Sequence, residues 1–316
     1  MAWLRLIRWK NLVIIYLTQL LVWACVMLPM WQYTESPMLL NGFNFSLLTI
    51  STILIAAAGY IINDYFDIKI DVINKPEKVV LERSISLKTA IVSHTTLNVA
   101  GIVLAAIVAK QVHHYEWLLL QFVCTALLWF YSTHFKRRFV IGNFVVAILT
   151  AFTIIVFMLY EPAIHYYWFR TGFVKVMNGY APNPVWVLGI YTYFAFMLTW
   201  MREVVKDMED FKGDAEEGCI TMPIKWGLKR SIRFTQVLGL LVIIPLLFGA
   251  VKLFKASWWL LGVYTIVVLV VPIAIWLVFL QREATKAHYH KASNGIKLIM
   301  VLGISSLIIY YFQVHV

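Results

Sequence analysis

Residues 256–280 of the chain read ASWWLLGVYTIVVLVVPIAIWLVFL and contain no charged side chain. An α-helix needs about 20 consecutive, mostly apolar residues to cross the hydrocarbon core of a bilayer, so this stretch predicts a membrane-spanning helix. Eight other stretches meet the same requirement, at approximately residues 11–30, 43–62, 89–109, 114–134, 139–160, 184–203, 234–251 and 294–313. The sequence therefore predicts an all-α integral membrane protein with nine transmembrane helices.

The composition of the whole chain supports this class. Of its 316 residues, 61% are hydrophobic and 14% are charged, whereas an ordinary soluble domain has about 25% charged residues. The mean hydropathy is +0.78. The three cysteines, Cys25, Cys124 and Cys219, lie far apart and lack the spacing of a metal site. These features exclude a secreted disulfide scaffold, a disordered chain and a soluble nucleic-acid binder.

Lysine and arginine are unevenly distributed between the predicted loops. With the N-terminus in the cytoplasm, 22 of the 27 basic residues fall on the cytoplasmic side and five on the external side. Cytoplasmic loops carry such an excess, so we expect a cytoplasmic N-terminus and an external C-terminus in a multi-pass protein of the cell (inner) membrane. The net charge of +11 reflects this bias and contact with anionic membrane lipids, so nucleic acid is not an expected partner. Residues 1–10 run into the first span without a cleavage site and predict a retained helix.

The six aspartates of the chain form two triplets with the same spacing. They are Asp64, Asp67 and Asp71, and then Asp207, Asp210 and Asp214. Each triplet has the pattern D-x-x-D-x-x-x-D, follows the end of an apolar span and lies on the predicted cytoplasmic side; the offset is 143 residues for every member. The match predicts a pseudo-repeat of residues 63–88 and 202–233 within a single transmembrane domain, residues 1–316. Sites in membrane proteins with repeats often lie at the repeat interface.

The spacing of the triplets predicts metal chemistry. Residues at i, i+3 and i+7 share one face of a helix, so each triplet brings three carboxylates together. Such carboxylates repel one another near a low-dielectric boundary and are stabilised by a cation. Clusters of hard oxygen ligands suit Mg²⁺, Mn²⁺ or Ca²⁺, and Mg²⁺ commonly completes its coordination shell with water and substrate phosphates. Two facing triplets therefore predict a diphosphate held between metal ions.

Basic side chains near the triplets can contact phosphate oxygens that metal ions leave free. The candidates are Lys69, Lys75, Lys78, Lys136, Arg137, Arg138, Arg202 and Lys206. The cytoplasmic excess of basic residues accounts for most of them. Arg202 and Lys206 are different, because helical spacing ties them to the second triplet.

Two longer motifs surround the triplets. The first runs from Asn63 to Asp71 as NDYFDIKID and continues into NKP at residues 74–76. The second runs from Arg202 to Asp214 as REVVKDMEDFKGD and continues to Gly218 and TMPI at residues 221–224. These motifs resemble the two aspartate-rich signatures of the UbiA superfamily of intramembrane prenyltransferases. Shorter similarities, which extend the resemblance over nearly the whole chain, are Arg8, Asn11, Tyr131-Ser132, Lys136 and Gly142-Asn143.

The resemblance implies a fold, a reaction and a set of site residues. The fold is nine transmembrane helices around a central cavity, with cytoplasmic caps after the second and sixth helices. The reaction is Mg²⁺-dependent transfer of a polyprenyl group from its diphosphate to an acceptor. The resemblance assigns one Mg²⁺ to Asn63, Asp64, Asp67 and Asp71, and a second Mg²⁺ to Asp207, Asp210 and Asp214. It assigns the diphosphate to Lys136 and Lys206, the allylic carbon to Tyr131, and the acceptor side to Asn11, Asn143 and Arg202.

The second motif most resembles the branch that transfers geranylgeranyl to geranylgeranylglyceryl phosphate in ether lipid synthesis. It resembles the homogentisate and chlorophyll-type transferases less closely, and the 4-hydroxybenzoate branch has a different second motif. Residues 78–83 read KVVLER, where the family often has an Arg-Pro pair and a Ser-Gly turn. A lipid acceptor is therefore the first expectation, an aromatic acceptor of quinone or pigment biosynthesis is the alternative, and the oligomeric state stays open.

Two other classes of function use divalent cations. A divalent-cation transporter would hold its acids near the middle of the membrane, whereas these aspartates lie at the ends of spans. A prenyl diphosphatase would use the same metal ions and substrate, and only its product would differ.

Overall fold

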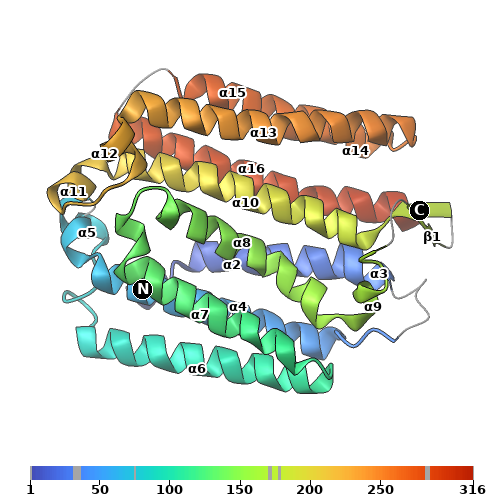
Figure 1. Ribbon diagram of the computed structural model, residues 1–316, viewed down its shortest axis with the longest axis horizontal. Coiled ribbons are helices and arrows are strands. Elements are labelled where there is room, and N and C mark those ends of the chain that lie inside the picture. The colour runs from blue at the N-terminus through green and yellow to red at the C-terminus, as the bar shows by residue number, and fades with distance from the viewer. Residues whose placement is uncertain are drawn as a thin grey trace.

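The computed structural model describes residues 2–30, 37–74, 76–169, 173–176, 179–281 and 285–315. They form helices that run side by side along the molecule, with one antiparallel hairpin (Figure 1). The helices are α1 (Ala2–Leu6), α2 (Trp9–Val22), α3 (Leu28–Met30), α4 (Gly42–Phe66), α5 (Ile68–Asn74), α6 (Leu87–Gln111), α7 (Leu118–Thr133), α8 (Ile141–Tyr160), α9 (Pro162–His165), α10 (Pro184–Glu209), α11 (Phe211–Glu216), α12 (Met222–Trp226), α13 (Leu228–Lys255), α14 (Trp259–Tyr264), α15 (Val271–Phe279) and α16 (Lys286–His315). Single turns of π- or 3₁₀-helix are η1 (Trp23–Met27), η3 (Pro76–Lys78), η4 (Tyr115–Trp117), η5 (Phe135–Arg137) and η6 (Thr265–Val270), and the hairpin is β1 (Phe173–Val176) with β2 (Gly179–Pro182).

Eight helical segments of the described chain are long and apolar enough to cross a membrane. They are Trp9–Met30, Gly42–Phe66, Leu87–Gln111, Ile141–Tyr160, Pro184–Glu209, Leu228–Lys255, Trp259–Phe279 and Lys286–Val314. They correspond to eight of the predicted spans, so the prediction of a helical, multi-pass membrane protein is confirmed. The other predicted span, 114–134, corresponds to α7, which is shorter at 16 residues.

The connection formed by residues 161–183, which is rich in aromatic residues, contains both α9 and the hairpin. The hairpin was not predicted, although the β-branched and aromatic residues of Phe173–Val176 favour strands. Residues 170–172 and 177–178 of this connection lie outside the described residues. Glu161 fixes the start of the connection, because its carboxylate accepts hydrogen bonds from the backbone N–H of Leu40 at 2.7 Å and of Ala163 at 3.0 Å.

The two aspartate segments lie at the same end of the bundle. Figure 1 shows the N-terminus, α5, α11 and α12 at one end, and the C-terminus, α9 and β1 at the other. Helix α5 contacts α11, although α4 and α10, which precede them, are far apart in sequence. We call this end of the molecule the aspartate end.

Both aspartate triplets lie across a helix end, and this differs from the predicted single helical face. Helix α4 ends before Asp67 and α10 ends before Asp210, and a short helix follows each of these two residues. The backbone angles agree closely, with φ −96° and ψ 2° at Asp67 and φ −94° and ψ 7° at Asp210. Aspartate tolerates such non-helical angles because its short polar side chain competes with the helical backbone. The two motifs therefore share a backbone geometry as well as a spacing.

Close packing of α7 against α4 shapes the wall of the central cavity. Gly59 of α4 allows this approach, because a Cβ atom there would lie 2.6 Å from a methyl carbon of Leu128. On the other side of the bundle, α10 packs against α13 and α16 through a buried apolar core that includes Met201, Val205, Val242 and Ile296. The cavity lies between these two packed regions.

Candidate active site

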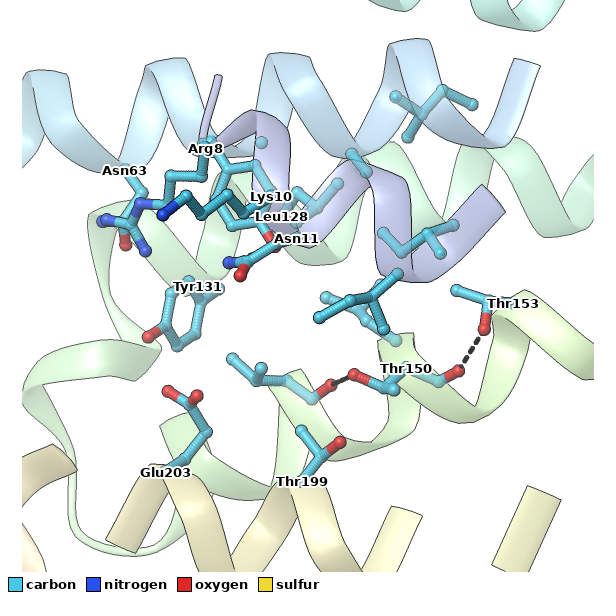
Figure 2. Close-up of a pocket in the computed structure, with 18 of the residues that line it drawn as sticks. Arg8, Lys10, Asn11, Asn63, Leu128, Tyr131, Thr150, Thr153, Thr199 and Glu203 are labelled. Carbon is cyan, nitrogen blue, oxygen red and sulfur yellow. Dashed lines mark hydrogen bonds between the residues drawn. The ribbon is translucent and has the colours of Figure 1, made fainter. Parts of the chain in front are cut away.

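A cavity of about 800 Å³ extends from the aspartate end into the bundle. Residues of α2, α4, α7, α8, α10 and α16 line it. Polar side chains gather at the aspartate end, and its apolar lining includes Ile14, Ile15, Ile55, Leu120, Leu128, Val146, Leu149, Phe152 and Val156. Figure 2 shows Arg8, Asn63, Tyr131 and Glu203 around one end, with Thr150 and Thr153 further along. The cavity can therefore accept a molecule with a polar head and an apolar tail.

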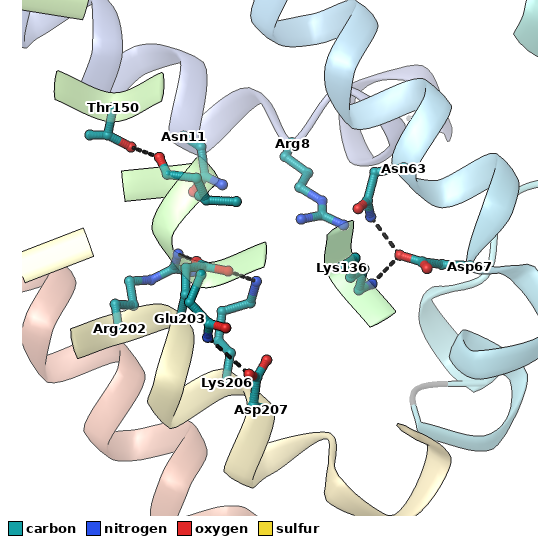
Figure 3. A network of polar contacts seen from close by, with 12 residues as sticks. Arg8, Asn11, Asn63, Asp67, Lys136, Thr150, Arg202, Glu203, Lys206 and Asp207 are labelled. Carbon is teal, nitrogen blue, oxygen red and sulfur yellow. Dashed lines mark hydrogen bonds and ion pairs between the residues drawn. The ribbon is translucent and has the colours of Figure 1, made fainter. Parts of the chain in front are cut away.

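The first aspartate triplet is paired with cations. Arg8 Nη2 lies 2.7 Å from Asp64 Oδ1. Asp67, whose side chain is 4% exposed, forms an ion pair with Lys136 and accepts a hydrogen bond of 2.7 Å from Asn63 Nδ2 (Figure 3). Burial acts against the charge of Lys136, yet Asp67 beside it keeps the pKa of the ammonium above its usual range. Lys136 thus holds a positive charge directly at the first triplet.

The second triplet has a neutral partner at its first member. Asn143 Nδ2 donates a hydrogen bond of 2.9 Å to Asp207 Oδ2. Asp210 lines the cavity, whereas Asp207, Asp214 and Asn143 are not among the lining residues. The resemblance assigned Asn143 to the acceptor side, and in the structure the amide of this residue contacts the second triplet.

The third members of the two triplets have similar electrostatic surroundings. Burial raises the pKa of Asp71 and of Asp214 to about 6 in each case, and Lys136 opposes the shift at both. The Asp67 carboxylate contributes to the rise of the pKa in both cases. The triplets therefore share one electrostatic field, in which an added cation would favour the ionised carboxylates.

A single side chain of the first motif joins the two aspartate segments. Asn74 Nδ2 donates to the backbone carbonyl of Asp210 at 3.0 Å, and Asn74 Oδ1 accepts from the Gly213 N–H at 3.0 Å. Lys286 Nζ donates to the backbone carbonyl of Asn74. Position 213 leaves no room for a side chain, because a Cβ atom there would lie 2.5 Å from Asn74 Nδ2. These contacts hold α5 and α11 in a fixed relation.

A second group of basic residues lies on the α2, α10 and α16 side of the cavity (Figure 3). Glu203 accepts from Arg202 Nη1 at 2.8 Å through one carboxylate oxygen and from Lys206 Nζ at 2.9 Å through the other. Lys297 Nζ donates to Asn11 Oδ1 at 3.1 Å, and Asn11 Nδ2 donates to Tyr60 Oη at 3.2 Å.

Ten of the predicted site residues line this one cavity. They are Asn11, Asn63, Asp64, Asp67, Asp71, Tyr131, Lys136, Arg202, Lys206 and Asp210. The sequence interpretation assigned no role to Glu203 or Lys297. Glu203 had a signal in its place beside Arg202 in the second motif, but Lys297 had none, because it lies far in sequence from both motifs. Lys75, noted as a basic neighbour of the first triplet, lies outside the described residues.

The donor set of the aspartate end fits a hard divalent cation that uses few protein ligands. Among the residues that the structure describes, no group of three or more His, Cys, Asp or Glu side chains is arranged to hold a metal ion. The carboxylates of Asp64 and Asp67 contact cationic side chains instead. Mg²⁺ typically takes one or two carboxylates and completes an octahedral shell with water and phosphate oxygens. Facing carboxylates with an amide at Asn63 suit such an ion, whereas a cage of protein ligands is not present among these described residues.

A membrane-embedded helical bundle with acids and basic residues at one end of an apolar-walled cavity defines a class of intramembrane enzymes. The chain belongs to the UbiA prenyltransferase family, because a match to this family extends over residues 12–308. It is thus a prenyltransferase, and the resemblance seen in its sequence motifs is confirmed.

Known relatives agree with this assignment over most of the chain. The digeranylgeranylglyceryl phosphate synthase of Methanothermobacter thermautotrophicus is 31% identical over 271 residues, which cover 82% of this chain and 83% of that protein. A solved digeranylgeranylglyceryl phosphate synthase structure is 25% identical, has a TM-score of 0.64, and covers 99% of this chain and 98% of its own. A UbiA homologue from Archaeoglobus fulgidus, solved with DMAPP and Mg²⁺, shares the fold with a TM-score of 0.59, 16% identity and 99% coverage of both chains.

Proposed function

We propose that the protein transfers a geranylgeranyl group from its diphosphate to geranylgeranylglyceryl phosphate, in a reaction that depends on Mg²⁺. The observation that carries this proposal is the meeting of two aspartate segments at one end of an 800 Å³ cavity with apolar walls. The relatives named as digeranylgeranylglyceryl phosphate synthases support the acceptor. The homologue solved with DMAPP and Mg²⁺ supports a prenyl diphosphate and a magnesium ion.

The aspartate end would hold the diphosphate. Asn63, Asp64, Asp67 and Asp71 would supply the few protein ligands of one Mg²⁺, and Asp207, Asp210 and Asp214 would supply those of a second. When bound, these ions supply charge neutralisation for the leaving diphosphate. Lys136 and Lys206 add positive charge from opposite sides, one beside Asp67 and the other on α10. Asn74 keeps the two segments at a fixed separation through its contacts with α11.

The rest of the cavity would hold the prenyl chain and the acceptor. The allylic C–O bond would break with its electron pair leaving on the diphosphate, a C–O bond to the acceptor hydroxyl oxygen would form, and the hydroxyl proton would pass to the released diphosphate. Tyr131 would lie beside the allylic carbon, where an aromatic ring favours positive charge. Apolar side chains around the prenyl tail keep water from the cationic carbon. Asn11 and Arg202 would face the acceptor, and Asn143 would act through Asp207.

The proposed topology is a single transmembrane domain in the cell membrane with nine crossings, of which α7 is the fourth. Support comes from the termini, which lie at opposite ends of the bundle and therefore require an odd number of crossings (Figure 1). The excess of lysine and arginine at the aspartate end supports a cytoplasmic active site and an external C-terminus. Helices α5 and α11 would be the cytoplasmic caps, and residues 63–88 and 202–233 the two copies of a pseudo-repeat.

A single assay in membranes tests the function. Radiolabelled geranylgeranyl diphosphate and Mg²⁺ are supplied with geranylgeranylglyceryl phosphate, and in parallel with homogentisate, dihydroxynaphthoate or 4-hydroxybenzoate. We expect a labelled diether phospholipid that disappears when EDTA is added. Label on an aromatic product would retain the fold and metal site but change the acceptor class. Release of prenyl alcohol alone would contradict the transfer reaction and favour a diphosphatase.

A further inference from the structure

The polar part of the cavity has two levels that are one helical turn apart. The outer level contains Asp64 of α4 and Lys206 of α10. Tyr60 and Arg202 precede these residues by four positions on the same helices, and four residues of α-helix rise by about 6 Å. We call the group formed by Asn11, Tyr60, Arg202 and Lys297 the inner level. All four residues line the cavity.

The basic residues where the two levels meet, Arg202, Lys206 and Lys297, carry more positive charge than Glu203, the carboxylate beside them, can compensate. Glu203 divides its two oxygens between Arg202 and Lys206, so one negative charge serves two cations. Lys297 contacts a neutral amide oxygen, that of Asn11, at 3.1 Å. Arg202 and Lys206 line the same cavity as Lys297. Three cations, Arg202, Lys206 and Lys297, therefore line this part of the cavity, and the single carboxylate of Glu203 contacts two of them.

Two buried donors at this position have no partner in the structure. Arg202 Nε is inaccessible and makes no hydrogen bond. The hydroxyl of Thr199, which lies one turn before Arg202 on α10, is also buried and makes no hydrogen bond. Thr199 lines the cavity, and 4% of its surface is exposed. An unpaired buried donor is unfavourable, and a donor on a charged group is more so. An anion accepting from these groups would remove both the unpaired donors and the excess charge.

We propose that Arg202, Lys297 and Thr199 form an anion-binding subsite for the acceptor, distinct from the aspartate end that holds the diphosphate. The inference rests on the proposed function and names the acceptor class, a molecule with a phosphate monoester or a carboxylate. Asn11 is a positioning residue, because its amide is fixed by Tyr60 and in turn holds the Lys297 ammonium. Separate cations for two anionic substrates limit their mutual repulsion, and the subsite selects anionic acceptors over neutral ones.

The test is Lys297→Gln, with Lys291→Gln as the matched control on an exposed position of the same helix. We expect Lys297→Gln to raise the KM for geranylgeranylglyceryl phosphate about 10- to 100-fold, the usual effect of a charged hydrogen bond. The KM for geranylgeranyl diphosphate stays unchanged, and Lys291→Gln matches the unaltered protein in both constants. With geranylgeranylglycerol, which lacks the phosphate, the protein and Lys297→Gln become equally poor. An unchanged acceptor KM, or an equal rise in both KM values, would overturn the inference.

A binding measurement separates this inference from the proposed function. Protein in nanodiscs with EDTA is titrated with geranylgeranylglyceryl phosphate or homogentisate, and tryptophan fluorescence reports binding. We expect the unaltered protein to bind one of these anions and Lys297→Gln to bind it at least about 10-fold more weakly; the two arms distinguish a phosphate from a carboxylate. Binding of neither anion, or equal binding by both proteins, would overturn the subsite. Binding without any prenyl transfer would support the subsite and contradict the proposed function.

Discussion

The two aspartate segments have the same spacing and the same interrupted helix, yet their neighbours differ in charge. Arg8 and Lys136 contact the first triplet, whereas an uncharged amide, Asn143, contacts the first member of the second. The backbone of the motif is thus repeated, but its first member contacts a cation in one triplet and a neutral amide in the other. This difference indicates that the charge of Asp64 is compensated by a cation of the protein itself, whereas Asp207 depends more on what binds there.

The largest expected effect tests whether both segments serve one reaction. Asp67→Asn and Asp210→Asn each remove a carboxylate charge from one half of the proposed metal and diphosphate site. We expect each to lower kcat by about 10³-fold, as when a group that stabilises developing charge is lost. The measurement is prenyl transfer in membranes at saturating Mg²⁺.

The control for this pair is Glu216→Gln, which removes an acid from the exposed side of α11 and whose side chain is 50% exposed. It should retain full activity. If only one of the two aspartate variants lost activity, the two segments would not serve one reaction, because one of them would then have no part in turnover.

The next effect concerns the difference in charge compensation. Lys136→Gln leaves Asp67 buried without its cation, and breaking such a pair costs about 3–5 kcal/mol of folding free energy. Asn143→Ala removes one hydrogen bond to Asp207, which costs about 1–3 kcal/mol of folding free energy. We expect Lys136→Gln to lower the unfolding temperature in EDTA more than Asn143→Ala does.

Added Mg²⁺ sharpens this second test. The ion should restore most of the stability of Lys136→Gln, since it supplies the positive charge that the lysine provided. Thermal unfolding in detergent, with and without Mg²⁺, measures this recovery. Equal losses for the two variants would mean that the two triplets do not differ in their need for a cation.

A smaller effect is expected from the contact that joins the segments. Asn74→Ala removes both hydrogen bonds to α11, and Gly213→Ala forces a methyl group against the same side chain. Each should lower kcat/KM about 10-fold by separating the two halves of the site, because such contacts contribute about 1 kcal/mol or more each. Steady-state kinetics at varied Mg²⁺ should show a raised metal requirement.

The double variant, with both Asn74→Ala and Gly213→Ala, tests whether the two changes break the same contact. Two changes that break one contact are not additive, so the double variant should resemble either single one. Fully additive losses would show that Asn74 and Gly213 act independently.

The sequence predicted those features of the molecule that depend on residues close to one another in the chain. Apolar runs such as residues 256–280 define spans by themselves, and the equal spacing of the two triplets identified most of the site. It did not predict the interruption of both helices at Asp67 and Asp210, because helical spacing alone cannot show where a helix ends. Nor did it predict the contact of Lys297 with Asn11, since this depends on how the last helix packs against the first span, 286 residues away in sequence.

The smallest expected effect concerns the third members of the triplets, Asp71 and Asp214, whose pKa values are alike. The pKa of Asp71 and Asp214 is about 6 in the folded protein, against about 3.9 in an unfolded chain. Between about pH 4 and pH 6 the folded state therefore binds more protons, so these two groups make stability fall as pH rises through that window. The loss is at most about 2 kcal/mol for each group, because solvent screens part of it.

The difference in unfolding temperature between the protein and Asp71→Asn, measured in EDTA from pH 4.5 to pH 7.5, isolates one group from the other titrating carboxylates. We expect Asp71→Asn to be no more stable than the protein at the acid end and more stable above about pH 6, where the unaltered carboxylate must ionise in a buried position. Asp214→Asn should show the same curve, and Mg²⁺ should reduce both differences by favouring the ionised carboxylates. If only one variant showed this pH dependence, the two triplets would also differ in the surroundings of their third members, as they differ in their contacts with Arg8, Lys136 and Asn143. If both variants showed the same pH dependence, the two triplets would differ only in the residues that contact their first two aspartates.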